Sequence, residues 1–238
     1  MENKIYIIGD VHGCYKTLLA LVDKLPNKQN SNICFVGDLC DRGNNSKDVI
    51  EFVKSNNYDC ILGNHEMFFI NGVKNILQSS KINEDTSYWL KSCGGEESIN
   101  SYKTYDILDE KLLKEHLSWL KTLPLYKEYK NIKTEDNRYL VVSHSHVNNK
   151  WELKNSNKNT KEHGIFINTV LFSRFKNYDN PEIFNVFGHT PTKDAIIQKH
   201  KASIDLGCVY KNDTSLEGKL CALEFPSMKV FMQENIEN

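Results

Sequence analysis

Three short apolar runs in the first third of the chain end in the same way. Residues 5–8 lead into GDVHG, residues 33–36 into GDLCDRG, and residues 60–62 into GNHE. An apolar run that stops at a glycine indicates a buried strand. Because open α/β sheets bind ligands at the carboxyl ends of their strands, we expect the acidic, histidine and asparagine side chains of these motifs to meet at one sheet edge.

Helical periodicity separates these runs. Apolar residues recur at helical spacing over residues 15–25 and 67–77, and the segment between them carries Val49, Ile50 and Val53 on one face, capped by Asn45 or Ser46. The alternation of strands and helices predicts parallel strands joined by right-handed crossovers.

The remainder of the chain is predicted to contain helices at residues 86–93 and 109–123 and strands at 125–129, 138–143 and 183–187. Two of these strands end in HSH and GHT. Residues 203–209 and 219–225 are predicted to form a closing hairpin, followed by a strand at 229–232, as a second sheet or an extension of the first. The Lys- and Asn-rich segment 148–163 is interpreted as an exposed polar loop within a single domain, residues 1–238.

Charge and composition exclude several function classes. The net charge of −1 gives no general field that would attract nucleic acid or an anionic membrane. No apolar run approaches the roughly 20 residues that span a bilayer, and no secretory signal is recognisable at the first residues. The seven cysteines contain no CxxC pair, so neither a zinc knuckle nor a dithiol redox site is indicated. We therefore expect a reduced, cytoplasmic, bacterial protein, with its oligomeric state open.

The polar residues at the strand ends suit a pair of metal ions. Asp10 and His12 lie two residues apart after the first strand, and Asp38 follows the second, where one carboxylate can bridge two ions. Oxygen and imidazole ligands favour manganese, iron or zinc. Further candidate ligands are Asn64, His144 and His189. Two ions about 3.5–4 Å apart clamp a phosphoryl group and activate water for in-line attack.

Each of these residues alone has a plainer interpretation. A single aspartate after a strand is usually a turn former or helix cap, and a single buried histidine is usually a hydrogen-bonded core residue. The combination of five apolar strands that each end in His, Asp or Asn favours the metal site.

The motifs together resemble the PPP family of metallophosphoesterases, in particular its bacterial and phage protein phosphatase branch. GDVHG, GDLCDRG, GNHE, the strand ending in His144 and the late GHT carry the resemblance, and WLKSCGG, WLKTLPL and IDLGCVY also fit. The resemblance implies an α/β metallophosphoesterase (calcineurin-like) fold, in which two packed mixed β-sheets are flanked by helices and a dimetal site lies at the sheet edge.

The resemblance also implies residue roles. The first ion would be held by Asp10, His12 and bridging Asp38, and the second by Asp38, Asn64, His144 and His189. Manganese is the expected metal, with iron or zinc as alternatives. His65 would be the general acid, and Asp41 would hold it protonated in the correct tautomer. The substrate phosphate would contact Arg42, Asn64 and Arg174.

Three positions depart from the family pattern. Leu62 stands where arginine is common, so one phosphate contact is absent or supplied by another residue. Arg174 fits an aromatic-x-Arg pattern loosely, with Phe172 in place of tryptophan, and a surface helix residue is the alternative. For His146, an exposed loop histidine is favoured over a second-metal or substrate contact.

The leading function is hydrolysis of phosphoserine and phosphothreonine in proteins, with small phosphoesters as possible substrates. The alternative is hydrolysis of dinucleoside polyphosphates such as diadenosine tetraphosphate. Symmetrically cleaving enzymes that resemble this family typically lack the DRG aspartate, whereas Asp41 is present here and asymmetrically cleaving relatives keep it. An inactive metal-binding scaffold is a third hypothesis, which the intact ligand set disfavours.

Overall fold

The computed structural model of the chain describes residues 4–26, 32–174 and 180–238. Its main elements are two five-stranded sheets. The first sheet has the order β12 (Lys229–Glu234), β11 (Lys219–Phe225), β1 (Ile5–Ile8), β2 (Asn32–Phe35) and β3 (Asp59–Cys60). The second sheet has the order β6 (Tyr126–Lys133), β7 (Tyr139–Ser143), β8 (Ile183–Phe187), β10 (Lys201–Ser203) and β9 (Ile196–Ile197).

Both sheets are mixed, as predicted. Strands β1, β2 and β3 are parallel, whereas β11 pairs antiparallel with β1. In the second sheet β7, β8 and β10 are parallel, and β6 and β9 pair antiparallel at the two edges. The helices α1 (Tyr15–Lys24) and α2 (Ser46–Ser55) connect the parallel strands of the first sheet. The predicted strand–helix alternation is therefore confirmed.

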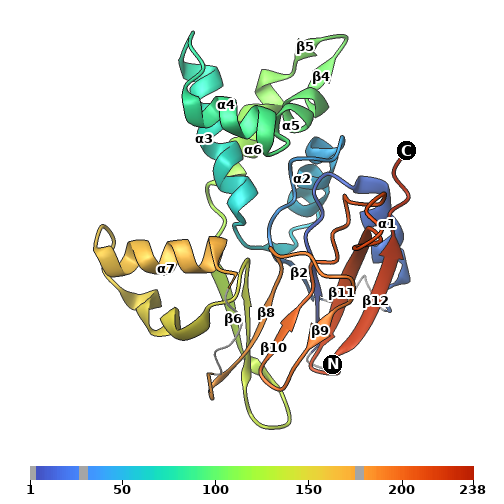
Figure 1. Ribbon diagram of the computed structural model, residues 1–238, viewed down its shortest axis with the longest axis vertical. Coiled ribbons are helices and arrows are strands. Elements are labelled where there is room, and N and C mark those ends of the chain that lie inside the picture. The colour runs from blue at the N-terminus through green and yellow to red at the C-terminus, as the bar shows by residue number, and fades with distance from the viewer. Residues whose placement is uncertain (1–3, 27–31, 175–179) are drawn as a thin grey trace.

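Alternating side chains along the strands build two different cores. Ile5 and Ile7 of β1 face the second sheet and pack in a cluster with Leu140 and Val142 of β7. The intervening residues of β1 point the other way, into a cluster covered by α1 and α2. On the outer face of the second sheet, a third cluster lies under α7 (Lys161–Phe172). The period of two thus places helices outside and the apolar sheet-to-sheet contact inside (Figure 1).

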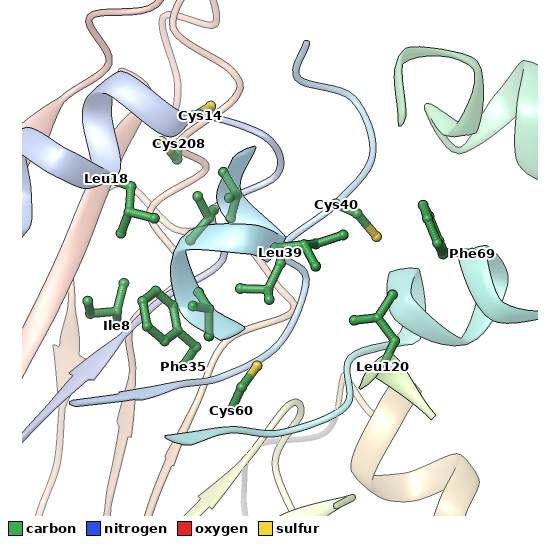
Figure 2. Packing of buried hydrophobic residues seen from close by; sticks show 14 of the residues in the cluster. Ile8, Cys14, Leu18, Phe35, Leu39, Cys40, Cys60, Phe69, Leu120 and Cys208 are labelled. Atoms are coloured by element: carbon green, nitrogen blue, oxygen red, sulfur yellow. The ribbon is translucent and has the colours of Figure 1, made fainter. Parts of the chain in front are cut away.

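A group of helices projects beyond the carboxyl ends of the parallel strands (Figure 1). We call this group the helical arm. It consists of α3 (Asn64–Gln78), α4 (Glu84–Ser92), α5 (Gly95–Ser101), α6 (Glu110–Leu120) and the small hairpin β4 (Lys103–Thr104) and β5 (Ile107–Leu108). The arm shares the core of the helix-covered face of the first sheet, where Figure 2 shows Leu39 and Cys40 lying between the sheet residue Phe35 and the arm residue Phe69.

The predicted closing hairpin is wrong. Residues 203–209 and 219–225 share one backbone hydrogen bond, from Lys219 N–H to the Leu206 carbonyl oxygen, but form no hairpin ladder, because β10 belongs to the second sheet and β11 to the first. Between these strands the chain crosses from one sheet to the other and buries Ile204 and Leu206 in the core between them. The hairpin is instead formed by β11 and β12. The apolar pattern located the strands but carried no information about their partners.

The exposed polar loop predicted for residues 148–163 is shorter than expected. Residues Asn148–Asn155 form a 3-10 helix, η2, and α7 begins at Lys161. Trp151 of η2 is 5% exposed, and its ring centroid lies 4.9 Å from that of Tyr126. This one large aromatic side chain anchors an otherwise polar segment to the second sheet.

All seven cysteines are buried and none forms a disulfide. They pack as small apolar side chains. No helix in residues 4–26, 32–174 and 180–238 has the length and apolar character needed to cross a membrane.

Candidate metal centre and active site

Polar side chains from five strand ends meet along one edge of the two sheets, which we call the sheet rim. The loops after β1, β2 and β3 supply residues from the first sheet, and the loops after β7 and β8 supply His144 and His189 from the second. The residues brought together are those predicted as ligands and acid: Asp10, His12, Asp38, Asp41, Asn64, His65, His144 and His189. The site therefore forms only when the two sheets pack against each other with these strand ends side by side.

One group of ligand atoms is centred on Asp38, His144 and His189. Single ligand atoms of these three residues all lie within 4.8 Å of one another. Asn64 joins the group, because its Oδ1 lies 2.8 Å from His144 Nε2 and 3.0 Å from His189 Nδ1. The four residues correspond to the set predicted for the second ion.

The hydrogen bond on the far side of His144 explains why this group fits a cation. Nδ1 of His144 donates to the carbonyl oxygen of Val36 at 2.9 Å, so Nε2 carries a lone pair. That lone pair faces Asn64 Oδ1 and, at 3.5 Å, Asp38 Oδ2. Three acceptor atoms without a proton between them repel one another, and a divalent ion would remove the repulsion.

A second group contains His12, Asp38 and His65, again with ligand atoms within 4.8 Å. His12 Nδ1 donates to the carbonyl oxygen of Cys40 at 2.8 Å, which leaves Nε2 facing Asp38 Oδ2 at 3.5 Å. Asp38 thus belongs to both groups, as a bridging carboxylate must.

Asp10 lies outside both groups. Its carboxylate accepts the backbone N–H of His189 at 3.0 Å. Burial, together with the charges of Asp205 and Asp38, raises the pKa of Asp10 well above its usual value. A buried carboxylate whose pKa is raised by neighbouring carboxylates favours a nearby cation, so Asp10 remains a candidate ligand.

The electrostatics of the rim keep its ligands in the forms that bind metal. Burial lowers the pKa of His12 and of His144, and burial with the neighbouring His144 lowers the pKa of His189 to about 3. These imidazoles are therefore neutral near pH 7. Burial alone would raise the pKa of Asp38, but the facing His144 and the other rim histidines lower it below its usual value. Neutral imidazole and ionised carboxylate are the metal-binding states.

His65 and Asp41 form a buried pair beside the second group. His65 Nδ1 donates to Asp41 Oδ2 at 2.7 Å, and Asp41 is fully buried. Burial lowers the pKa of His65, but the charge of Asp38 and the bond to Asp41 outweigh it and raise the pKa above its usual value. The protonated form required of a general acid is favoured.

Two residues that sequence reasoning missed hold Asp41 in place. Trp89 Nε1 donates to Asp41 Oδ2 at 2.9 Å, and Ser98 Oγ donates to Oδ1 at 2.7 Å. Both belong to the helical arm, on α4 and α5. Gly72 and Gly95 pack against the Trp89 ring so closely that an added Cβ would lie 2.0 Å and 2.4 Å from ring atoms. The available signal was the WLKSCGG segment, in which two glycines follow a tryptophan by five and six residues.

Glu66 is a further residue that sequence reasoning missed. Its buried carboxylate accepts the backbone N–H groups of Asp38 at 2.8 Å, Leu39 at 2.7 Å and Gly63 at 2.8 Å. Burial and the charge of Asp38 raise the pKa of Glu66 to about 7. A glutamate three residues after a helix N-cap is the signal that could have identified it. Glu66 fixes the loop from which Asp38 projects.

Five rim residues adopt the left-handed backbone region, in which non-glycine residues are uncommon. Their φ angles are +46° for His12, +52° for Asp38, +70° for Asp41, +69° for Arg42 and +70° for His189. The turns after the strands therefore direct these side chains back across the rim.

The two predicted phosphate-binding arginines occupy different places. Arg42 Nη1 donates to His12 Nε2 at 2.6 Å, and its guanidinium lies 5.5 Å from the centroid of the Tyr210 ring. Arg174 is exposed after the end of α7. The Phe172 ring, two residues earlier, lies 6.4 Å from that of His189, and the charge of Arg174 contributes to the lowered pKa of His189, so the end of α7 lies beside this part of the rim.

His146 and Leu62, two of the departures from the family pattern, have different environments in the structure. The expectation of an exposed His146 is wrong, because its side chain is buried and its ring centroid lies 5.1 Å from that of Phe187. The polar HSH motif continues into the core of the second sheet. Leu62 is half-buried, and its backbone N–H donates to the carbonyl oxygen of Pro124 at 2.8 Å, so this position offers no side-chain donor to a phosphate.

Two curated proteins similar to this chain in sequence are both tetraphosphatases that act on dinucleoside compounds by name. The symmetrical bis(5'-nucleosyl)-tetraphosphatase of Proteus mirabilis is 26% identical over 75% of this chain, which spans 60% of that protein's length. The asymmetrical bis(5'-nucleosyl)-tetraphosphatase PrpE of Oceanobacillus iheyensis is 29% identical, over 94% of this chain and 89% of the relative.

Solved structures share the fold at low identity. A protein serine/threonine phosphatase from Saccharomyces cerevisiae aligns with a TM-score of 0.59 and 15% identity, over 99% of this chain and 81% of the other. A metallophosphoesterase from Sphaerobacter thermophilus gives a TM-score of 0.53 and 14% identity, over 99% and 89%. The family model described as calcineurin-like phosphoesterase matches residues 3–215. With that match and the metal-binding groups of the rim, the chain belongs to the calcineurin-like phosphoesterase family of metal-dependent hydrolases.

Proposed function

We propose that this chain hydrolyses dinucleoside polyphosphates. The observation that carries the proposal is the match to the asymmetrical tetraphosphatase PrpE, which extends over 94% of this chain and 89% of the relative. The buried Asp41–His65 pair supports a hydrolytic reaction, because a positioned acid is needed where a leaving oxygen takes up a proton. The substrate is an anion with several phosphates between two nucleosides.

Two divalent ions are proposed to bind at the rim, and manganese is the expected metal, with iron or zinc as alternatives. Asp38, Asn64, His144 and His189 would hold one ion. His12, Asp38 and Asp10 would hold the other. When bound, two such ions polarise phosphoryl oxygens and make a water molecule acidic enough to attack phosphorus at neutral pH.

The chain's own side chains are proposed to orient the phosphate and move the proton. Arg42 donates N–H groups to the phosphoryl oxygens, Arg174 approaches them from the second-sheet side, and the amide of Asn64 contributes a further N–H. His65 gives its proton to the oxygen that leaves phosphorus, and Asp41 keeps the imidazole in the tautomer that can do so.

A serine/threonine protein phosphatase is the second candidate. The same rim, the same acid and the same arginine serve a phosphoserine or phosphothreonine ester, and the Saccharomyces cerevisiae protein phosphatase shares the fold. The dinucleotide proposal takes precedence because the Oceanobacillus iheyensis relative is more similar in sequence and nearly equal in length.

The experiment that tests the proposal compares two substrates at equal concentration. Protein stripped of metal and resupplied with manganese is given diadenosine tetraphosphate or a phosphothreonine peptide. Faster nucleotide turnover is the expected result. Faster peptide turnover would replace the proposal with the protein phosphatase. Activity on neither substrate, with nitrophenyl phosphate also untouched, would favour a scaffold.

A further inference from the structure

A polar cavity of about 350 Å³ adjoins Arg42 on the helix-covered side of the first sheet. The beginning of α1, the loop after β2 and the segment before β11 line it, together with Asn235, Glu237 and Asn238. Its volume lies at the lower end of the range for ligand-binding pockets. Since Arg42 also donates to His12 Nε2 at 2.6 Å, one side chain contacts both the cavity and the rim.

The cavity is lined by three cations, Lys16, Arg42 and Lys211. Within the described ranges, none of the three forms a salt bridge with a carboxylate. Lys211 Nζ donates to the backbone carbonyl of Glu237, and Arg42 lies over the Tyr210 ring. Like charges gathered around one cavity repel one another, and an anion that enters it would relieve that repulsion.

Donors at and beside the cavity already bind a carboxylate of this chain. Oε1 of Glu237 accepts the backbone N–H of Thr17 at 2.9 Å and its hydroxyl at 3.1 Å. Asn45 Nδ2 donates to the other carboxylate oxygen at 3.3 Å. The Thr17 side chain is fully buried, so this hydrogen-bonding arrangement is built into the start of α1. Phosphate oxygens place the same demands on donors as carboxylate oxygens.

We propose that this cavity binds the phosphates of the substrate that lie beyond the one attacked at the rim. The inference rests on the proposed function, because only a polyphosphate has such phosphates. A phosphate held by Arg42 at the rim would continue toward Lys16 and Lys211, whereas a phosphoserine or phosphothreonine side chain has nothing to place there. The cavity thus selects for polyphosphates over monoesters.

The test uses inorganic tripolyphosphate as a competitive inhibitor of nitrophenyl phosphate hydrolysis by the manganese-loaded protein. In the double variant Lys16→Gln/Lys211→Gln, the ratio of the inhibition constant to the KM of nitrophenyl phosphate is expected to rise about tenfold, because two charge-assisted contacts are lost. The matched control is Lys111→Gln/Lys121→Gln, which removes two exposed lysines from α6 and its C-cap, and its ratio is expected to stay at the wild-type value.

A third variant has the opposite expected sign. Glu237→Gln removes a negative charge from the cavity lining and is expected to lower the inhibition constant of tripolyphosphate. An unchanged ratio in the double lysine variant would overturn the inference, and it is the result that metal chelation alone would give. An equal rise of the ratio in the control pair would overturn the inference as well, because the effect would then not depend on the cavity. Failure of the proposed function is observed separately, as absent turnover of diadenosine tetraphosphate by the unmodified protein.

Discussion

The sheet rim and the helical arm contribute to the same site in different ways. On the rim, each ligand lies within a few residues of a strand end, and its backbone turn directs it inward. The arm contributes Trp89 and Ser98, which contact no predicted metal ligand and act through Asp41. The chemistry of the site therefore comes from local motifs, whereas the orientation of its acid depends on long-range packing.

Loss of the bridging carboxylate should have the largest effect. Asp38→Asn is expected to lower kcat/KM by about a thousandfold on every substrate, because both proposed ions share this residue and several kcal/mol of transition-state stabilisation depend on them. Metal content and manganese-dependent hydrolysis are the measurements. Asp106→Asn is the control, since this exposed aspartate has a similar φ of +65°. Normal metal content in the Asp38 variant would contradict the bridging role.

Removal of the acid should have the next largest effect, and the effect should depend on the leaving group. His65→Ala is expected to lower kcat about a hundredfold on glycerol phosphate, whose alkoxide needs a proton to leave. The loss should be much smaller on nitrophenyl phosphate, whose leaving group is stable without one. Parallel kcat measurements on the two esters decide the matter, and equal losses would remove His65 from the acid role.

The arm should matter less than the rim, but measurably. Trp89→Phe keeps most of the packing and removes the N–H that bonds to Asp41 Oδ2, so an activity loss of about tenfold is expected. The loss should again be greater on glycerol phosphate than on nitrophenyl phosphate, which distinguishes misorientation of the acid from general destabilisation. Trp119→Phe, in α6 of the same arm, is the control. If both variants behave alike, the orienting role of Trp89 is wrong.

The smallest effect is expected within the arm itself. His116 is buried between α2 and the arm: its Nε2 donates to Glu51 at 2.6 Å, and its Nδ1 accepts the hydroxyl of Tyr102 at 2.8 Å. Tyr102→Phe is expected to lower the free energy of unfolding by about 1 kcal/mol. Urea denaturation measures the change. Within the described residues the Tyr102 hydroxyl bonds to His116 and to no rim residue, so a loss of activity larger than the Trp89→Phe loss would contradict the separation of rim and arm.

Sequence reasoning predicted the rim well and the arm poorly, for a physical reason. Asp10, Asp38 and Asn64 follow apolar runs directly, so their common location follows from the parallel order of the strands. Trp89 and Ser98 reach Asp41 across 48 and 57 residues of sequence, and no local pattern encodes such a contact. The WLKSCGG segment, which contains Trp89, fitted the family resemblance, but the resemblance did not indicate the hydrogen bond from Trp89 to Asp41.

The remaining errors have the same origin. The pairing of β11 with β1 joins residues more than 200 positions apart, so the expected hairpin was the wrong local choice. The polar loop was predicted too long because burial of one side chain, Trp151 against Tyr126, orders a segment that is otherwise rich in lysine and asparagine. Arg174 fitted its pattern only loosely. It is exposed after α7 and belongs to neither ligand group, but its charge still acts on His189 at the rim.

The left-handed turns of the rim restrict which mutations the protein can tolerate even when catalysis is not selected. Aspartate, asparagine and histidine are the non-glycine residues that adopt positive φ most readily, and they are also the ligands that divalent ions of this kind prefer. At His12, Asp38 and His189, backbone geometry and metal chemistry therefore favour the same few residue types. A library screened for solubility alone would already be depleted of valine, isoleucine and threonine at these positions, so conservation there would overstate the contribution of function.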